Sequence, residues 1–76
     1  MLAIGTKILK LATGQRGFVA GNKLIPHKPT VNIYNKKEIF PLNDYLIFLV
    51  KEIKDNEIDY SGPFDVYESE IREHLW

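Results

Sequence analysis

The chain has 76 residues, of which 45% are hydrophobic and 26% charged, and its formal net charge is zero. We expect one small folded domain over residues 1–76, because disordered chains combine low hydrophobicity with high net charge. The sequence has no cysteine, which excludes disulfides, thiolate metal sites and a cysteine nucleophile. The longest apolar run, Tyr45–Val50, is far shorter than the roughly 20 residues of a membrane-spanning helix. No targeting signal is visible, so we expect a cytoplasmic protein that does not contact membranes.

The neutral average hides an uneven distribution of charge. Residues 1–37 carry seven cations and no carboxylate, whereas residues 38–76 carry ten carboxylates and three cations, so the halves have charges of +7 and −7. The favoured interpretation is that the halves interleave in the fold and neutralise each other, with little gain from each exposed pair. The alternative is a dipolar surface with separate basic and acidic patches.

Two short apolar runs near the N-terminus flank a turn at Thr13-Gly14-Gln15, which predicts a pair of β-strands within Lys7–Asn22. The second run ends at Gly21-Asn22, a dipeptide suited to a two-residue hairpin. We therefore expect the chain to return as Lys23–Ile25, with Val19 opposite Leu24 and Phe18 opposite Ile25.

The middle of the chain predicts further strands. Pro26–Pro29 favours a stiff, extended connection, because each proline fixes its own φ and restricts the residue before it. Thr30–Tyr34 alternates between apolar and polar residues, as a half-buried strand does. Asn35–Lys37 then predicts a turn, and Glu38–Leu42 a short edge strand in which Pro41 is tolerated.

Residues 44–54 decide the fold class. Leu46, Leu49, Val50 and Ile53 match the spacing of one helix face, which would make the protein α+β. The run is also rich in aromatic and β-branched residues, and Asp55-Asn56 offers a turn into an alternating partner strand, Glu57–Tyr60. We favour the strand.

The C-terminal residues predict a break followed by a short helix. Ser61-Gly62-Pro63 interrupts the strand pattern. Asp65 and Glu68 have capping-box spacing, and Tyr67, Ile71 and Leu75 would share one helix face. The expected fold is mainly β, a small barrel of about five strands with a short C-terminal helix.

Gly5-Thr6-Lys7-Ile8, followed by Gly14-Gln15-Arg16-Gly17-Phe18-Val19, resembles the start of SH3-like small barrels of the KOW and Tudor kind. In these barrels a strand, a glycine turn and a Gly-x-Val strand come first, and the last strand often runs into a short helical turn, which Phe64–Ile71 would form here. The resemblance concerns the order of elements. It implies a non-catalytic binding module for protein or nucleic acid and transfers no site residue.

No pattern in the sequence predicts catalysis. Gly14–Gly17 spells G-x-x-G, but it precedes a strand-like run, so we interpret it as a turn and not as a phosphate clamp. His27 and His74 have no spacing that places a base beside a nucleophile. Glu70 and His74 are better explained as a solvated helix end than as metal ligands. We expect no enzyme activity, no metal and no cofactor.

Two binding functions remain, and the neutral net charge leads us to favour protein interaction, in which the chain would be a small accessory or inhibitory factor. A protein-interaction module would use exposed aromatic residues as anchors, namely Tyr34, Tyr60 and Trp76. Nucleic-acid binding, the alternative, would stack bases on Tyr34 or Phe18 and use the basic half, namely Lys7, Lys10, Arg16, Lys23, Lys28, Lys36 and Lys37.

Three aromatic side chains, Phe18, Phe40 and Phe48, are expected to fill the core, together with Tyr45. Trp76 either folds back to close the core or is offered to a partner. Self-association is a further possibility, because the two halves have complementary charge.

Overall fold

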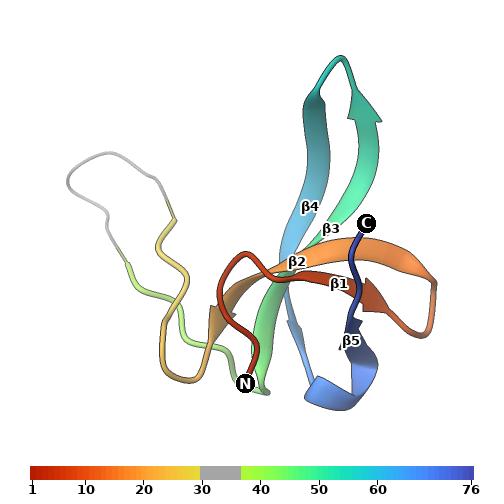
Figure 1. The fold of residues 1–76 in the computed structure, drawn as a ribbon. Coiled ribbons are helices and arrows are strands. Elements are labelled where there is room, and N and C mark those ends of the chain that lie inside the picture. The colour runs from red at the N-terminus through yellow and green to blue at the C-terminus, as the bar shows by residue number, and fades with distance from the viewer. Residues whose placement is uncertain (30–36) are drawn as a thin grey trace.

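A computed structural model describes residues 1–29 and 37–76, which form one antiparallel five-stranded sheet (Figure 1). The strands are β1 (Lys7–Lys10), β2 (Gln15–Asn22), β3 (Tyr45–Lys54), β4 (Glu57–Val66) and β5 (Ile71–Glu73). Their order across the sheet is β4-β3-β2-β1-β5, so the sheet is not closed, and β4 and β5 form its edges. The mainly β fold with five strands is confirmed. The alternative helix over residues 44–54 is wrong, because residues 45–54 form β3.

The N-terminal strand pair is confirmed. β1 and β2 pair from Lys7 opposite Phe18 to Lys10 opposite Gln15. The turn between them contains Gly14 at a φ of 70°, a left-handed conformation that glycine adopts at little cost.

The predicted hairpin at Gly21-Asn22 is wrong. Both residues lie inside β2, where Gly21 is opposite Leu46 and Asn22 is opposite Tyr45. The chain turns after them, because the buried Asn22 Oδ1 accepts hydrogen bonds from the backbone N–H groups of Leu24 and Ile25, at 2.9 and 2.7 Å. Asn22 Nδ2 donates to the Leu2 carbonyl at 3.0 Å. An asparagine that bonds the backbone two and three residues ahead produces a turn without a returning strand, so Val19 does not face Leu24, nor Phe18 Ile25.

The described residues between β2 and β3, 23–29 and 37–44, are mostly irregular. His27 and Ile39 form an isolated bridge through two backbone hydrogen bonds of 3.0 and 2.8 Å. This bridge takes the place of the edge strand predicted for Glu38–Leu42. The predicted strand Thr30–Tyr34 falls on residues outside the described part, as do the first two residues of the predicted turn Asn35–Lys37.

The predicted hairpin between residues 45 and 60 is confirmed. Asp55 and Asn56 have φ values of 51° and 64°, and Lys54 lies opposite Glu57, as in a two-residue type I′ turn. The break predicted at residues 61–63 is wrong, since β4 continues through them to Val66. The pairing of β3 with β4 shifts register between residues 47 and 49 of β3, so Gly62 and Pro63 are accommodated in β4 as in a β-bulge.

The C-terminal helix is represented by one 3₁₀ turn, Glu68–Glu70, and the residues after it form β5. Asp65 does not cap this turn, because its carboxylate accepts the backbone N–H groups of Leu42 and Asn43 at 2.6 and 2.8 Å. After the 3₁₀ turn the chain pairs with the free edge of β1 and forms β5. Within the described residues no helix is long and apolar enough to cross a membrane.

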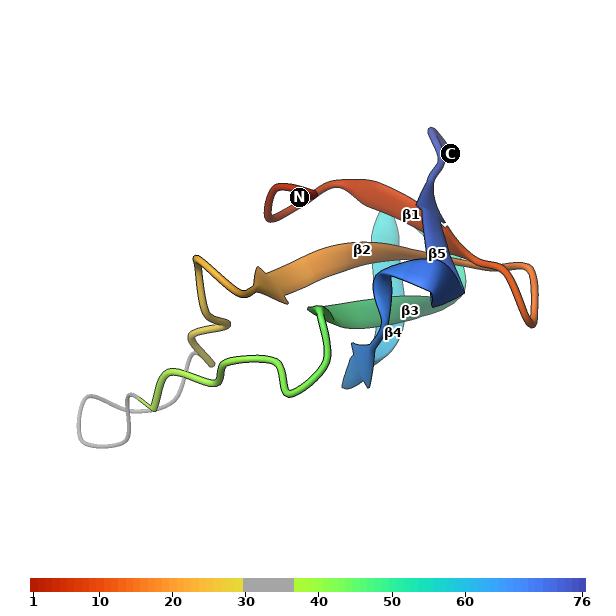
Figure 2. The same ribbon diagram turned by 90° about the horizontal axis from the view of Figure 1, so that it is seen from below.

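The core lies on the inner face of the sheet. It consists of side chains from every strand, namely Ile8, Val19, Tyr45, Ile47, Leu49, Val66 and Ile71. In a flat sheet the edge strands β4 and β5 would lie about 19 Å apart, four strand spacings. Four residues, three of them in a 3₁₀ turn, connect Val66 at the end of β4 to Ile71 at the start of β5. This connection is too short to span a flat sheet, so the sheet is strongly curved, as the course of β5 across the other strands shows (Figure 2).

Strand β2 can occupy the centre of this curved sheet because residue 17 has no side chain. A Cβ on Gly17 would overlap the carbonyl oxygen of Phe48, and it would lie 3.2 Å from side-chain carbons of both Ile8 and Leu49.

We predict that Gly17→Ala destabilises the protein by about 3 kcal/mol, because it overpacks the centre of the sheet. Gly14→Ala is the control, since its added Cβ meets no atom within 4 Å, and its positive φ should cost only about 1 kcal/mol. Urea unfolding of the two variants measures the difference. Equal destabilisation would contradict this role of Gly17.

Candidate binding surface

Aromatic side chains gather on the outer face of the sheet, opposite the core. Phe18 lies opposite Phe48, and Tyr60 lies opposite Val50, two residues further along β3. Side chains alternate between the faces of a strand, so Phe18, Phe48 and Tyr60 all point away from the core residues Val19, Ile47 and Leu49. We call these three residues, together with His27, the outer aromatic face.

Phe48 is the centre of the outer aromatic face. Its ring centroid lies 5.4 Å from that of Phe18, 4.9 Å from that of Tyr60 and 5.4 Å from that of His27. Tyr60 and His27 meet Phe48 edge to face, at interplanar angles of 71° and 74°, an arrangement that aromatic pairs favour. Phe18 and Phe48 are half-buried and Tyr60 is 49% exposed. The rings pack against one another and remain partly exposed to solvent.

The core assignment of three phenylalanines is therefore wrong. Phe18 and Phe48 lie on the outer face, and Phe40 is 52% exposed in the irregular segment. Tyr45 is in the core as predicted, and its hydroxyl accepts the backbone N–H of Leu2 at 2.9 Å. The core inside the curve of the sheet is small, and aliphatic side chains fill most of it.

Trp76 folds back onto the outer face beside the aromatic residues and does not join the core. Its indole Nε1 donates to the Gly17 carbonyl at 3.0 Å. Lys7 Nζ lies 4.8 Å and Arg16 Cζ 5.5 Å from the indole ring centroid, both within cation–π range. Lys7 Nζ also donates to the Trp76 carbonyl at 3.0 Å. Two cations thus hold the indole over β1 and β2.

A third cation lies on the same side of the sheet. Arg72 of β5 is opposite Leu9, which is in turn opposite Arg16, and residues directly opposite one another share a face. Arg16 and Lys7 lie on the Phe18 side of this face, since Arg16 is two residues from Phe18 and Lys7 is opposite it. The outer face is therefore aromatic over β2–β4 and basic over β1, β2 and β5.

The two charged halves of the sequence meet in an ion pair within residues 1–29 and 37–76, Lys28–Glu38, at 3.3 Å and exposed. Several carboxylates bind backbone N–H groups instead: Asp44 accepts from Glu68 at 2.7 Å, and Glu70 from Tyr67 at 2.6 Å.

The remaining basic residues of the sequence prediction do not join the site. Lys23 donates to the carbonyls of Pro41 and Leu42, at 2.8 and 3.1 Å, and fastens the irregular segment. Lys10 lies opposite the buried Ile71, on the core side of the sheet. Lys37 is exposed in the irregular segment. Tyr34 and Lys36 lie outside the described residues.

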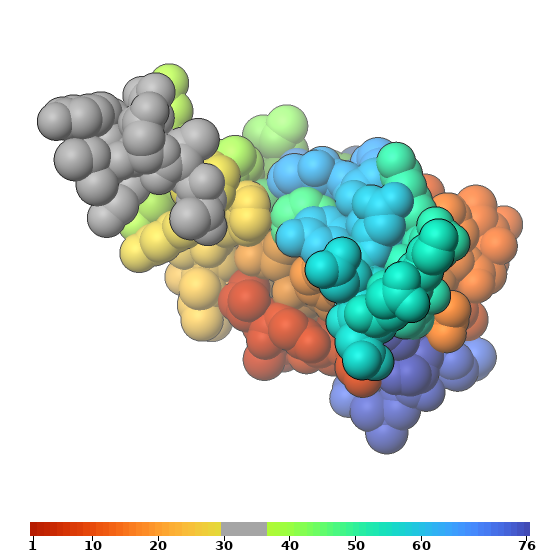
Figure 3. All heavy atoms as spheres, turned by 90° about the horizontal axis from the view of Figure 1, so that it is seen from above, coloured from red at the N-terminus to blue at the C-terminus, as the bar shows by residue number. Residues whose placement is uncertain are grey.

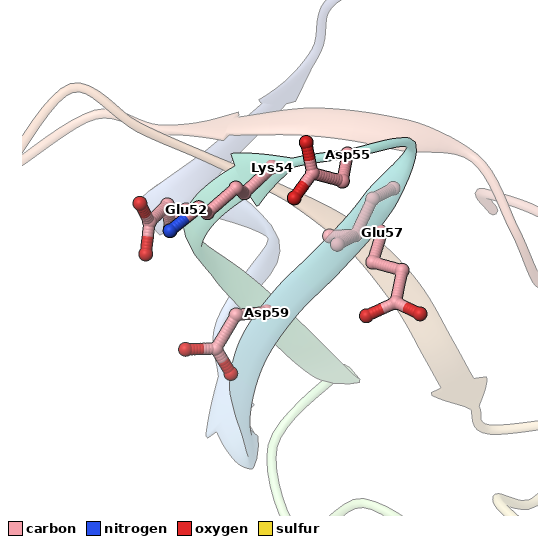
Figure 4. A pocket seen from close by; sticks show the side chains of 6 residues that line it. Glu52, Lys54, Asp55, Glu57 and Asp59 are labelled. Carbon is pink, nitrogen blue, oxygen red and sulfur yellow. The ribbon is translucent and has the colours of Figure 1, made fainter.

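The end of the β3–β4 hairpin, residues 51–60, is exposed along its whole length, and we call it the arm. An open hollow of about 380 Å³ at the arm is lined by Glu52, Lys54, Asp55, Glu57, Ile58 and Asp59. The carboxylates are spread around the arm and do not converge on one point (Figure 4). No group of three or more metal-ligating side chains is present in the described part of the chain.

Sequence reasoning missed part of this surface. His27 and Arg72 were not candidates for binding, and Phe48 was assigned to the core. One signal for Phe48 was available, because the strand alternation that buries Ile47 and Leu49 places Phe48 on the other face. No local signal places His27 over Phe48, since that contact depends on the turn after Asn22.

We predict that removing both cations above Trp76 loosens the indole. In Lys7→Met/Arg16→Met the fluorescence of Trp76, the one tryptophan of the chain, should be quenched more by acrylamide, because each exposed cation–π contact is worth about 0.5–1 kcal/mol. Lys51→Met, on the exposed arm, is the control and should leave quenching unchanged. Equal quenching in all three proteins would show that the cations do not hold the indole.

Comparisons with family models, with curated proteins and with solved structures found no match for this chain. The interpretation of the outer face therefore depends on its own residues.

Proposed function

We propose that the protein is a non-catalytic binding module that recognises another protein through the outer aromatic face. The observation that carries this proposal is the exposed aromatic cluster itself. Phe18, Phe48 and Tyr60 pack on one another outside the core, and Tyr60 keeps half of its surface in water. Leaving large rings exposed forgoes the free energy of burial, so a contiguous patch of them favours an interaction site.

The chemistry of the patch favours a protein partner. Interfaces between proteins are enriched in aromatic and arginine side chains at their centre, with polar residues around them. Here the centre is aromatic, and Lys7, Arg16 and Trp76 lie at one side.

We also propose that the sheet is a variant of the SH3-like small barrel. Three observations support this assignment: the strand order β4-β3-β2-β1-β5, the curvature that gathers all five strands around one core, and the 3₁₀ turn directly before β5. Such a fold would leave the outer surface of β2–β4 available for a partner.

Nucleic-acid binding is a second candidate because Lys7, Arg16 and Arg72 share the outer face with the aromatic rings. Two of these cations already contact Trp76, and Tyr60 meets both Phe18 and Phe48 edge to face, which leaves less ring surface for stacking bases. This candidate requires affinity for single-stranded RNA or DNA that falls steeply between about 50 and 200 mM salt. No binding at low salt would remove it.

The proposal predicts that Tyr60→Ser loses a protein partner that Tyr67→Ser retains. Both tyrosines are exposed, at 49% and 57%. Tyr60 packs in the aromatic cluster, whereas Tyr67 lies directly before the 3₁₀ turn. Affinity purification with crosslinking, from cells that naturally make the protein, measures the recovery of the partner. We expect Tyr60→Ser to lower recovery at least about tenfold, as loss of an anchor residue does.

Circular dichroism of both variants establishes that they are folded. Retention of the same partner by Tyr60→Ser would refute the proposal, as would its loss in Tyr67→Ser alone.

A further inference from the structure

We infer that the outer aromatic face binds the arm of a second copy of this chain. The inference rests on the proposed function of that face and names its partner. Each chain carries both elements, so two copies can dock reciprocally, the arm of each lying on the outer face of the other.

The arm has the composition of a docking element. Ile53 and Ile58 lie opposite each other and are 48% and 41% exposed. Ile58 shares a face with Tyr60, two residues away on β4, so the two isoleucines extend the apolar surface toward the tip. Seen from above, the arm stands in front of the other segments, and nothing covers its tip (Figure 3). An isolated two-stranded hairpin is marginally stable in water, so an arm with an exposed isoleucine pair gains from a partner.

The charges of the arm and of the outer face are complementary. The arm holds four carboxylates, namely Glu52, Asp55, Glu57 and Asp59, against two lysines. The cations Lys7, Arg16 and Arg72 lie on the outer face.

Glu52 lies opposite Asp59, and Glu57 opposite Lys54, on the side of the arm away from the isoleucines. Asp55 is at the tip. Stacked sheets lie about 10 Å apart, so the two sides of a ribbon are separated by no more than about one Debye length at 0.1 M salt, and these carboxylates still attract cations beneath the arm.

Reciprocal docking also satisfies the geometry of a closed dimer. A two-fold axis requires a self-complementary surface, in which residue i of one copy meets residue j of the other and j meets i. The tip lies four residues beyond Val50 and Tyr60, about 13 Å along the strands. The cations lie near the base of the arm, the carboxylates lie toward its tip, and the apolar surface lies between them. When two copies dock with their arms antiparallel, the tip of each arm therefore lies near the cations of the other copy.

A charge exchange tests this inference on the full chain. One variant is Arg16→Glu/Arg72→Glu, which reverses the basic side, and the other is Glu52→Lys/Glu57→Lys, which reverses the arm. All four residues are exposed, so both variants should fold. Sedimentation equilibrium gives the dimer dissociation constant of each protein and of the equimolar mixture.

We expect the wild type to dimerise more weakly as salt increases, and each variant alone to be monomeric because both of its contacts repel. The mixture should dimerise, since each reversed surface then meets its opposite. Ile58→Ser should raise the wild-type dissociation constant at least about tenfold, because each dimer loses two buried isoleucines. Leu24→Ser, at a 77% exposed leucine away from the arm, is the matched control and should have no effect.

A wild type that stays monomeric at millimolar concentration would overturn the inference, as would a mixture no more associated than its components or an unchanged dimer in Ile58→Ser. A monomer that still recovers another protein through Tyr60 would overturn this inference alone and leave the proposed function standing. A wild type that is monomeric and recovers no other protein through Tyr60 would refute the proposed function as well.

Discussion

The close approach of three strands at Gly17 is the constraint on which the rest of the structure depends. β2 pairs with β1 on one side and β3 on the other, and Ile8 and Leu49 meet over the position where a side chain of residue 17 would stand. Because the strands approach so closely, the sheet can curve around a small aliphatic core without a covering helix. Strand alternation places Phe18 and Phe48 on the face opposite this core, where their rings define the candidate site.

Much of the fold follows from local sequence signals. The apolar and β-branched run of β3, the Asp55-Asn56 turn and the Gly14 turn each predict their elements correctly, because strand alternation and turn chemistry depend on neighbouring residues. The errors arise where distant groups compete. Asn22 bonds the backbone ahead of it and ends β2 without a hairpin. Asp65 binds the N–H groups of Leu42 and Asn43, and Asp44 and Glu70 accept the first N–H groups of the 3₁₀ turn in its place.

The candidate site is predictable only in part. Tyr60, Lys7 and Arg16 were expected on a binding surface as exposed aromatic or basic residues, and the structure brings all three to the outer face. Two features of the site depend on the fold and not on local sequence. Trp76 joins this surface through a contact 59 residues apart in sequence, with the Gly17 carbonyl. The clustering of Phe48 with its neighbours depends on a strand register that composition does not encode.

The central claim is that the outer face of the sheet is a binding surface that the arm of a second copy occupies. Backbone amide spectra of isotopically labelled protein, recorded over a dilution series from millimolar to micromolar concentration, test it most directly. We expect concentration-dependent shifts confined to the arm, to the strand residues around Phe18, Phe48 and Tyr60, and to the cations Lys7, Arg16 and Arg72. Spectra that do not change with concentration, or shifts confined to the 3₁₀ turn, would contradict it.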